Sequence, residues 1–310
     1  MDQTKALLLE KELKGKSLDD FKVVKFINNG KSAAVFEAEK EGVKFALKVF
    51  DNDLIDRFGH EIQTIRIEQE IALKDHGIKG LVQIFSGGVA TLSGKEFFYL
   101  IMELIDGLNL KEYLVQRDID LEFIKGVLKQ LIETTEELID KKKIVHRDIK
   151  PENIMVNSHG DIILMDLGVL KFIGRESLSD EKRKEFLGTL RYAPREFLLR
   201  EEEDTVDGWR AVNYYQIGAT LHDLVMKKEL FHDKSPYSVL IMAILNENPI
   251  IEVNEYPIKL VKLVRDMLSK KWNLRISLVN TRVIEDVLSI SDEPEDEYGK
   301  SIEKLNKKRL

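Results

Sequence analysis

Residues 146–153 read His-Arg-Asp-Ile-Lys-Pro-Glu-Asn, and Asp166 follows at a distance that a short hairpin can span. A carboxylate such as Asp148 can take or orient the proton of an incoming hydroxyl, and the ammonium of Lys150 can neutralise a transferring phosphate. Asn153 and Asp166 offer oxygen ligands of the kind that suit Mg²⁺. Transfer of the γ-phosphoryl group of ATP needs such a set, because the protein must hold metal ions and aim a nucleophile rather than do covalent work.

This stretch resembles the protein-kinase signature H-R-D-L-x-x-x-N followed by D-F-G, and the resemblance extends from about Leu18 to Leu288. Leu167 replaces the usual Phe, a residue that packs and does not coordinate. Lys-Pro-Glu after Asp148 resembles the serine/threonine subclass, since tyrosine-specific members usually lack that lysine. Related small-molecule kinases usually carry Gly after the His and match less well. The resemblance implies an α+β, two-lobed protein kinase fold, with an antiparallel sheet and one main helix in the N-lobe and a mainly helical C-lobe.

The composition limits the class and the compartment. With 310 residues, 43% hydrophobic and 33% charged, the chain can bury a sizeable core as one two-lobed unit or two closely packed domains. The absence of cysteine excludes disulfides, thiolate metal sites and a Cys nucleophile. No apolar run reaches the length of a membrane span and no signal-peptide pattern is present, so we expect a cytoplasmic protein without a membrane partner. The net charge of -7 argues against nucleic acid as a main partner, and the oligomeric state stays open.

The chain is expected to divide into a flanking helix, one kinase domain and a charged tail. The predicted parts are the flanking helix at 1–17, the kinase domain at 18–290 (N-lobe 18–102, hinge 103–107, C-lobe 108–290) and the tail at 291–310. In the flanking segment, leucine alternates with Lys and Glu at helical spacing from Gln3 to about Leu13, and Gly15 is expected to end the helix. We expect this helix to pack on the domain rather than to dock a partner.

Hydrophobic periodicity predicts the elements of both lobes. Apolar runs bounded by turn residues predict N-lobe strands at 21–26, 34–39, 44–50, 81–85 and 97–103. A helix is expected between the third and fourth of these strands, at 56–73. Further helices are expected at 110–114, 121–139, 219–225, 237–245 and 258–268.

The hairpin at 28–35 lies where kinases carry the phosphate loop G-x-G-x-x-G-x-V. Only the middle glycine, Gly30, is kept. Because Asn tolerates positive φ and Ala is small, the backbone can still approach phosphates closely. By resemblance, the adenine and phosphate contacts fall on Asn28, Gly30, Val35, Ala46, Met102, the backbone of Glu103 and Ile105, and Met155.

Lys48 follows Ala-Leu in an apolar strand and resembles the V-A-I-K lysine that clamps the α- and β-phosphates. Such a lysine needs a carboxylate partner. Glu70 matches the family pattern best, because Ile67 and Ile71 flank it as that pattern requires, and Glu68 is the alternative.

The resemblance also assigns the catalytic and metal-binding roles. Asp148 would orient the hydroxyl, Lys150 would stabilise the transferred charge, and Asn153 and Asp166 would hold Mg²⁺. Thr189 matches the threonine that contacts the catalytic Asp and Lys in serine/threonine members.

Two further positions concern the framework of the C-lobe. Glu196 is expected to form the family's buried ion pair with Arg275, although Ala193 and Pro194 come one residue early for the usual A-P-E. Asn213 replaces the Asp that hydrogen-bonds the catalytic-loop backbone near the start of a helix. Asn can accept the same bond without charge, so we expect weaker but workable anchoring.

The segment between Gly168 and Thr189 resembles an activation segment. Three cations fall where kinases regulated by loop phosphorylation gather positive charge: Arg66, Arg147 and Lys171. Glu185 lies four residues before Thr189, where the phosphorylated residue often lies, so we hypothesise that it supplies the negative charge permanently. The competing interpretation is a phosphorylation site at Ser177 or Ser179.

These features predict a serine/threonine protein kinase that uses Mg²⁺ and ATP on a protein substrate, with autophosphorylation. The alternative of a different class is a pseudokinase that binds nucleotide or partners without turnover. The depleted glycine loop, Asn213 and the early Ala193-Pro194 favour the alternative. Against it, every residue to which a chemical role is assigned is present.

Overall fold

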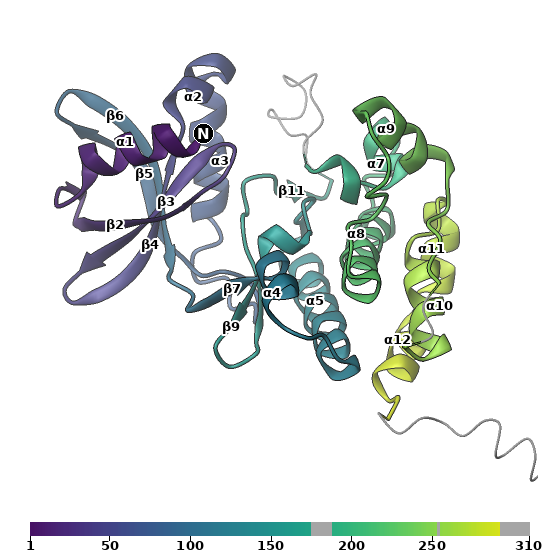
Figure 1. Ribbon diagram of the computed structural model, residues 1–310. Coiled ribbons are helices and arrows are strands. Elements are labelled where there is room, and N and C mark those ends of the chain that lie inside the picture. The colour runs from purple at the N-terminus through teal and green to yellow at the C-terminus, as the bar shows by residue number, and fades with distance from the viewer. Residues whose placement is uncertain (175–187, 253–254, 292–310) are drawn as a thin grey trace, which may run out of the picture.

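The computed structural model describes residues 1–174, 188–252 and 255–291. Figure 1 shows two lobes, an N-terminal lobe built on a sheet and a C-terminal lobe of helices, joined by the chain between β6 and β7. This arrangement confirms the two-lobed α+β fold that the sequence predicts.

The N-lobe sheet has six antiparallel strands in the order β1-β2-β3-β4-β6-β5. Its strands are β1 (Ser17–Leu18), β2 (Phe21–Asn29), β3 (Ala33–Lys40), β4 (Val43–Phe50), β5 (Ile84–Leu92) and β6 (Lys95–Glu103). Successive side chains of a strand point to opposite faces, so β4 sends Leu47 and Val49 into one apolar cluster and Ala46 and Phe50 into another. The second cluster continues into the C-lobe, whereas the first is closed by α1 (Gln3–Leu13).

Two predicted elements of this lobe are wrong in their bounds. The single helix expected at 56–73 is two helices, α2 (Asn52–Phe58) and α3 (His60–Ile71), because Gly59 has φ 104, a conformation that breaks a helix and that glycine adopts readily. The strand expected at 81–85 begins only at Ile84 and runs to Leu92. Glycine is required at position 87, because a Cβ there would lie 2.9 Å from the carbonyl oxygen of Tyr99. The sequence of this strand is therefore not apolar at that position, and its full length was not predicted.

The C-lobe is mainly helical. Its helices among the described residues are α4 (Leu110–Gln116), α5 (Leu121–Lys142), α7 (Arg195–Leu199), α8 (Val206–Met226), α9 (Tyr237–Asn246), α10 (Ile258–Met267), α11 (Trp272–Leu278) and α12 (Thr281–Leu288). Almost every residue of α8 from Gly208 to Val225 is buried, and the helix contacts α5, α10 and α11. Helix α8 is therefore the centre of this lobe (Figure 1).

The helix predicted at 219–225 is only the last part of α8. The helix begins at Val206, where the side chain of Thr205 accepts a hydrogen bond from the backbone of Gly208. Asn213 consequently lies in the second turn, not near the helix start as expected. Because α8 is buried on nearly all sides, it gave no amphipathic period by which to find its beginning.

The catalytic loop lies between α5 and α7 and is supported by short strands and 3₁₀ turns. They are β7 (Gly107–Asn109), β8 (Ile144–Val145), η1 (Pro151–Asn153), β9 (Ile154–Asn157), β10 (Ile162–Leu164), β11 (Lys171–Phe172) and η2 (Leu190–Tyr192). Strand β9 lies between β7 and β10, and β11 pairs with β8. These pairings hold the loop 146–153 against the segment that carries Asp166.

Candidate active site

Asp148 lies on the loop between β8 and η1, and its two carboxylate oxygens have different surroundings. Oδ2 accepts hydrogen bonds from Lys150 Nζ at 2.7 Å and from Asn153 Nδ2 at 2.9 Å. Oδ1 is buried and accepts no hydrogen bond from any described residue. Because the 3₁₀ turn of η1 follows directly, Asn153 folds back onto a residue five positions before it. One oxygen of a fixed carboxylate is thus left able to accept a proton.

His146 connects the catalytic loop to the segment before Asp166. Its Nε2 donates to the carbonyl oxygen of Met165 at 2.7 Å, and its Nδ1 accepts from the backbone N–H of Asp148 at 3.3 Å. The ring is fully buried, and this burial lowers the pKa of His146 and so favours the neutral imidazole that both bonds require. The ring thereby fixes Asp148 and Asp166 relative to each other.

Gln216, not Asn213, anchors the catalytic-loop backbone. Gln216 Nε2 donates to the carbonyl oxygen of Arg147 at 2.8 Å, and its Oε1 accepts from the N–H of Ile149 at 3.3 Å. The Oδ1 atom of Asn213 is buried and has no partner in the described part of the chain. The anchoring role predicted for Asn213 is therefore wrong, since a longer side chain one turn further along α8 reaches the loop on both sides of Asp148. Several polar residues occur in α8, so no signal in the sequence singled out Gln216.

Lys48 of β4 joins the two lobes. Its Nζ lies 2.7 Å from Oδ1 of Asp166, and Glu70 of α3 is buried nearby, with Glu68 exposed. The direct ion pair expected between Lys48 and Glu70 is not formed, and Oε1 of Glu70 has no hydrogen-bond partner among the described residues. Burial raises the pKa of Glu70 to about 7, whereas the charge of Lys48 holds the pKa of Asp166 far below its usual range. The carboxylate that pairs with the lysine is thus the one that stays ionised.

The side chains of Asn153 and Asp166 fit the hard oxygen ligation of Mg²⁺. Asn153 donates from Nδ2 to Asp148, which leaves its Oδ1 available as a ligand. Asp166 accepts from Lys48 at Oδ1, which leaves its Oδ2 available. Nowhere in the described ranges do three or more His, Cys, Asp or Glu side chains form a metal cluster. Mg²⁺ bound beside phosphates usually takes only one or two carboxylates from the protein, so this donor set is sufficient. Asp166 also has φ 58, a strained conformation of the kind found at functional sites.

The residues expected around adenine come from strands of both lobes. Ala46 pairs with Met102 across β4 and β6, and Met155 pairs with Asn109 across β9 and β7. Both backbone polar groups of Ile105 lack hydrogen-bond partners among the described residues, whereas the N–H of Glu103 donates to Gln83. A chain segment with free backbone groups between two apolar surfaces can bind the edge of a planar heterocycle.

The hairpin at the position of the phosphate loop is tight. Asn28 pairs with Val35, and Gly30 N–H donates to the carbonyl oxygen of Ala33 at 2.9 Å. The carbonyl oxygen of Ser32, at the tip, accepts from the N–H of Asp51 at 2.8 Å. The tip of the loop is thus bonded to the residue that follows β4.

Thr189 and Glu196 tie the far side of the site to the C-lobe. Lys150 Nζ donates to Oγ1 of Thr189. Arg275 Nη1 donates to Oε1 of Glu196 at 2.7 Å, and both side chains are buried, which confirms the predicted ion pair. The chain between these two residues is therefore fixed at both ends.

Of the predicted regulatory residues, three lie outside the described residues: Ser177, Ser179 and Glu185. The hypothesis about their charge stays a prediction. Arg147 donates from Nη2 to the carbonyl oxygen of Leu170 at 3.0 Å, and Lys171 lies 3.4 Å from Asp204. Arg66 lines a cavity of about 140 Å³ between α2, α3 and the tip of the β2–β3 hairpin.

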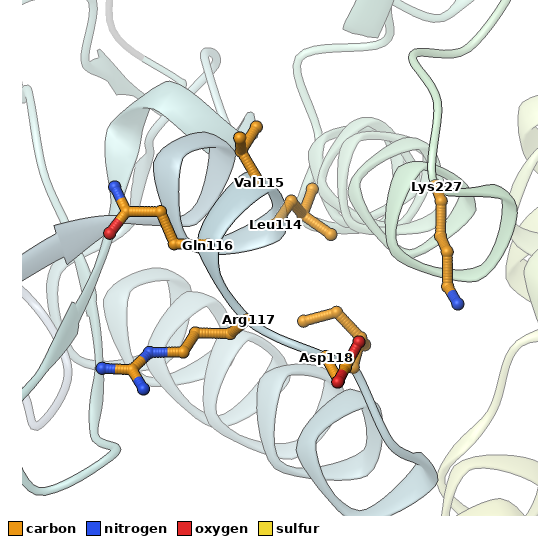
Figure 2. Close-up of a pocket in the computed structure, with 7 residues that line it drawn as sticks. Leu114, Val115, Gln116, Arg117, Asp118 and Lys227 are labelled. Atoms are coloured by element: carbon orange, nitrogen blue, oxygen red, sulfur yellow. The ribbon is translucent and has the colours of Figure 1, made fainter.

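A second cavity, of about 240 Å³, lies at the C-terminal end of α4. Figure 2 shows Arg117 and Asp118 on the chain that leaves α4, with Lys227 approaching from the end of α8. No residue assigned a catalytic or nucleotide-binding role lines this cavity, so it is separate from the site described above.

The fold and this assembly of Lys48, Asp148, Asn153 and Asp166 define a protein kinase. A family model described as the protein kinase domain matches residues 21–288, and the chain belongs to that family.

Several curated serine/threonine kinases are similar to the chain. Ribosomal protein S6 kinase beta of Caenorhabditis elegans is 30% identical over 215 residues, which cover 67% of this chain and 36% of that protein. A probable serine/threonine-protein kinase of Streptomyces coelicolor is 26% identical over 71% of this chain and 32% of its own length. A serine/threonine-protein kinase of Arabidopsis thaliana is 26% identical over 69% of this chain and 43% of its own length. The chain thus spans less than half of each of these relatives. Within the described residues, no helix combines the length and apolar character needed to cross a membrane.

Proposed function

We propose that this chain is a serine/threonine protein kinase that transfers the γ-phosphoryl group of Mg²⁺-ATP to hydroxyl groups of a protein, its own chain included. The observation that supports this best is the asymmetry of Asp148. Oδ2 is held by Lys150 and Asn153, while the buried Oδ1 has no partner among the described residues. A hydroxyl brought to Oδ1 as the side chains that cover this atom move aside would meet an acceptor that Lys150 and Asn153 already hold in alignment.

The other roles follow from position and charge. Lys48 would bind the α- and β-phosphates, with Glu70 behind it. Asn153 and Asp166 would hold Mg²⁺, which when bound neutralises charge on the phosphates. Lys150, bonded to both Asp148 and Thr189, would stabilise the transferring group.

The nucleotide base would lie between the apolar residues of the two lobes. Val35 and Ala46 would cover it from the N-lobe and Met155 from the C-lobe, with Met102 behind it. The free backbone groups of Ile105 and the carbonyl of Glu103 would supply the hydrogen bonds. The C-lobe face beside Asp148 would receive the protein substrate.

A pseudokinase is the alternative, and two observations favour it. The β2–β3 hairpin keeps one glycine of the family's three, and Asn213 Oδ1 is unpartnered among the described residues. The unpartnered Asn213 does not argue strongly for a pseudokinase, because Gln216 provides the hydrogen bonds to the catalytic loop that Asn213 does not.

The proposal is tested by transfer of label from γ-labelled ATP, with Mg²⁺, to the chain and to a generic basic acceptor protein. Asp148→Asn keeps the volume and the contact with Lys150 but cannot take a proton, so we expect the rate to fall by about 10²- to 10⁴-fold while nucleotide affinity changes by less than about twofold. Asp118→Asn, exposed and without a partner in the described part of the chain, is the matched control. Phosphoamino-acid analysis should place the label on Ser or Thr. Nucleotide binding by the wild-type chain without any transfer would support the pseudokinase instead.

A further inference from the structure

Helix α1 lies outside residues 21–288, which the family model matches, yet it contacts the phosphate-loop hairpin. Figure 1 shows it lying across the sheet beside β2, with its N-terminal end toward α2. Ala6 and Leu13 are fully buried, in one cluster with Leu47 and Val49 of β4. Lys48 lies between those two strand residues and faces the opposite side of the sheet. The helix therefore backs the strand that carries the phosphate-binding lysine.

Two polar contacts connect α1 and Met1, which precedes it, directly to the hairpin. Asn29 Nδ2 donates to the carbonyl oxygen of Met1 at 3.0 Å. The backbone N–H of Phe26 donates to Oε1 of Glu10 at 3.1 Å. Strand β1 pairs only with Phe21 and Lys22 of β2, so beyond Lys22 the outer edge of β2 has no neighbouring strand in the described part of the chain. Glu10 thus satisfies an amide that the sheet leaves open.

A third contact runs through Asp51. Lys5 Nζ donates to Oδ1 of Asp51, a side chain that is only 6% exposed, and to Asp53. The same Asp51 caps α2 by accepting from the N–H of Asp53 at 3.0 Å, and its own N–H donates to the carbonyl oxygen of Ser32 at 2.8 Å. Lys5 consequently fixes a residue that holds both the tip of the hairpin and the start of α2.

We propose that α1 positions the phosphate loop of this chain through Lys5, Glu10 and Asn29, and so increases its affinity for Mg²⁺-ATP. The inference rests on the proposed function. A loop held in place before binding loses less conformational entropy when nucleotide binds, which raises affinity without a new contact to the ligand. Lys5, Glu10 and Asn29 are positioning residues that act through the loop.

The test compares Lys5→Gln with Lys11→Gln, a lysine of the same helix that is exposed and has no partner among the described residues. The dissociation constant of a fluorescent ATP analogue with Mg²⁺ and the KM values for ATP and for the acceptor protein are measured for each. Replacing a charge-assisted hydrogen bond with the neutral one that Gln can make corresponds to roughly a fivefold to tenfold weaker affinity. We expect that change for Lys5→Gln in both ATP measurements, an unchanged KM for the acceptor, and recovery in Lys5→Arg.

Asn29→Ala supplies an independent variant, because it removes the donor to Met1, adds no charge beside the phosphates and leaves Lys5 intact. It should also weaken nucleotide binding, with a melting temperature close to that of the wild type. Equal ATP affinity in Lys5→Gln and Lys11→Gln, with transfer intact, would overturn the positioning role and leave the proposed kinase function standing. Weaker nucleotide binding in Lys5→Gln without transfer in any chain would refute the kinase function and support the positioning role.

Discussion

Replacing Gln216 with Ala should damage this kinase more than the same replacement at Asn213. Gln216 is 1% exposed and makes two hydrogen bonds to the loop backbone, one on each side of Asp148. Arg147 and Ile149 are themselves buried, so their freed carbonyl and N–H groups would have no water to bond. Asn213→Ala instead removes an oxygen that has no partner in the described part of the chain.

The magnitude follows from the two orphaned groups. Each buried polar group that loses its partner costs about 1–3 kcal/mol, so Gln216→Ala should lower the free energy of unfolding by roughly 3 kcal/mol. For a domain of this size, roughly 2–4 °C accompanies each kcal/mol, which gives a fall in Tm of about 6–12 °C. A displacement of Asp148 by about 1 Å would lower kcat by roughly 10²-fold.

Thermal unfolding and label transfer measure the two consequences separately. Asn213→Ala is the matched control, with an expected change in Tm of less than about 3 °C and kcat within about threefold of the wild type. If Asn213→Ala loses as much kcat as Gln216→Ala, or if Gln216→Ala melts within about 1 °C of the wild type, the anchoring role of Gln216 is refuted.

Two further predictions concern buried charges. Glu196→Gln leaves the fully buried Arg275 without its carboxylate and should lower stability by about 3–5 kcal/mol, whereas Glu133→Gln, in an exposed pair with Lys129, should change it by less than about 1 kcal/mol; equal shifts in Tm would contradict this. The pKa of Glu70 is raised from 4.5 to about 7, so its proton stabilises the folded state fully below pH 4.5 and this stabilisation is lost as the pH rises through 7. The free energy of unfolding of Glu70→Gln relative to that of the wild type should therefore increase between about pH 5 and 8, by up to about 3 kcal/mol, and the difference in Tm should increase with it. A difference in Tm that does not vary with pH would count against the buried, titrating carboxylate.

Much of the catalytic centre could be predicted from the sequence because its members are close together along the chain. Asp148, Lys150 and Asn153 meet through one 3₁₀ turn, so their spacing alone determines that they can share a site. The strands around Lys48 could be predicted from apolar runs bounded by turn residues, since β4 has one face toward each apolar cluster.

The bounds of helices and strands were predicted wrongly where the local sequence pattern and the tertiary context disagree. Gly59 divides what reads as one helix, and Gly87 interrupts the apolar signal of a strand whose backbone must approach Tyr99 closely. Helix α8 is buried on all sides and therefore has no polar stripe to mark its start.

Residue types at short spacings were enough to predict the two-lobed fold and to propose the chemistry and the residues that would carry it. Which side chains hold those residues in place became known only from the packing of the folded chain. Lys48 meets Asp166 across 118 positions, Gln216 reaches the loop across 69, and Lys5 reaches Asp51 across 46. Partners so far apart are selected by the packing of whole elements, and no local periodicity records which of several polar side chains will arrive at the site.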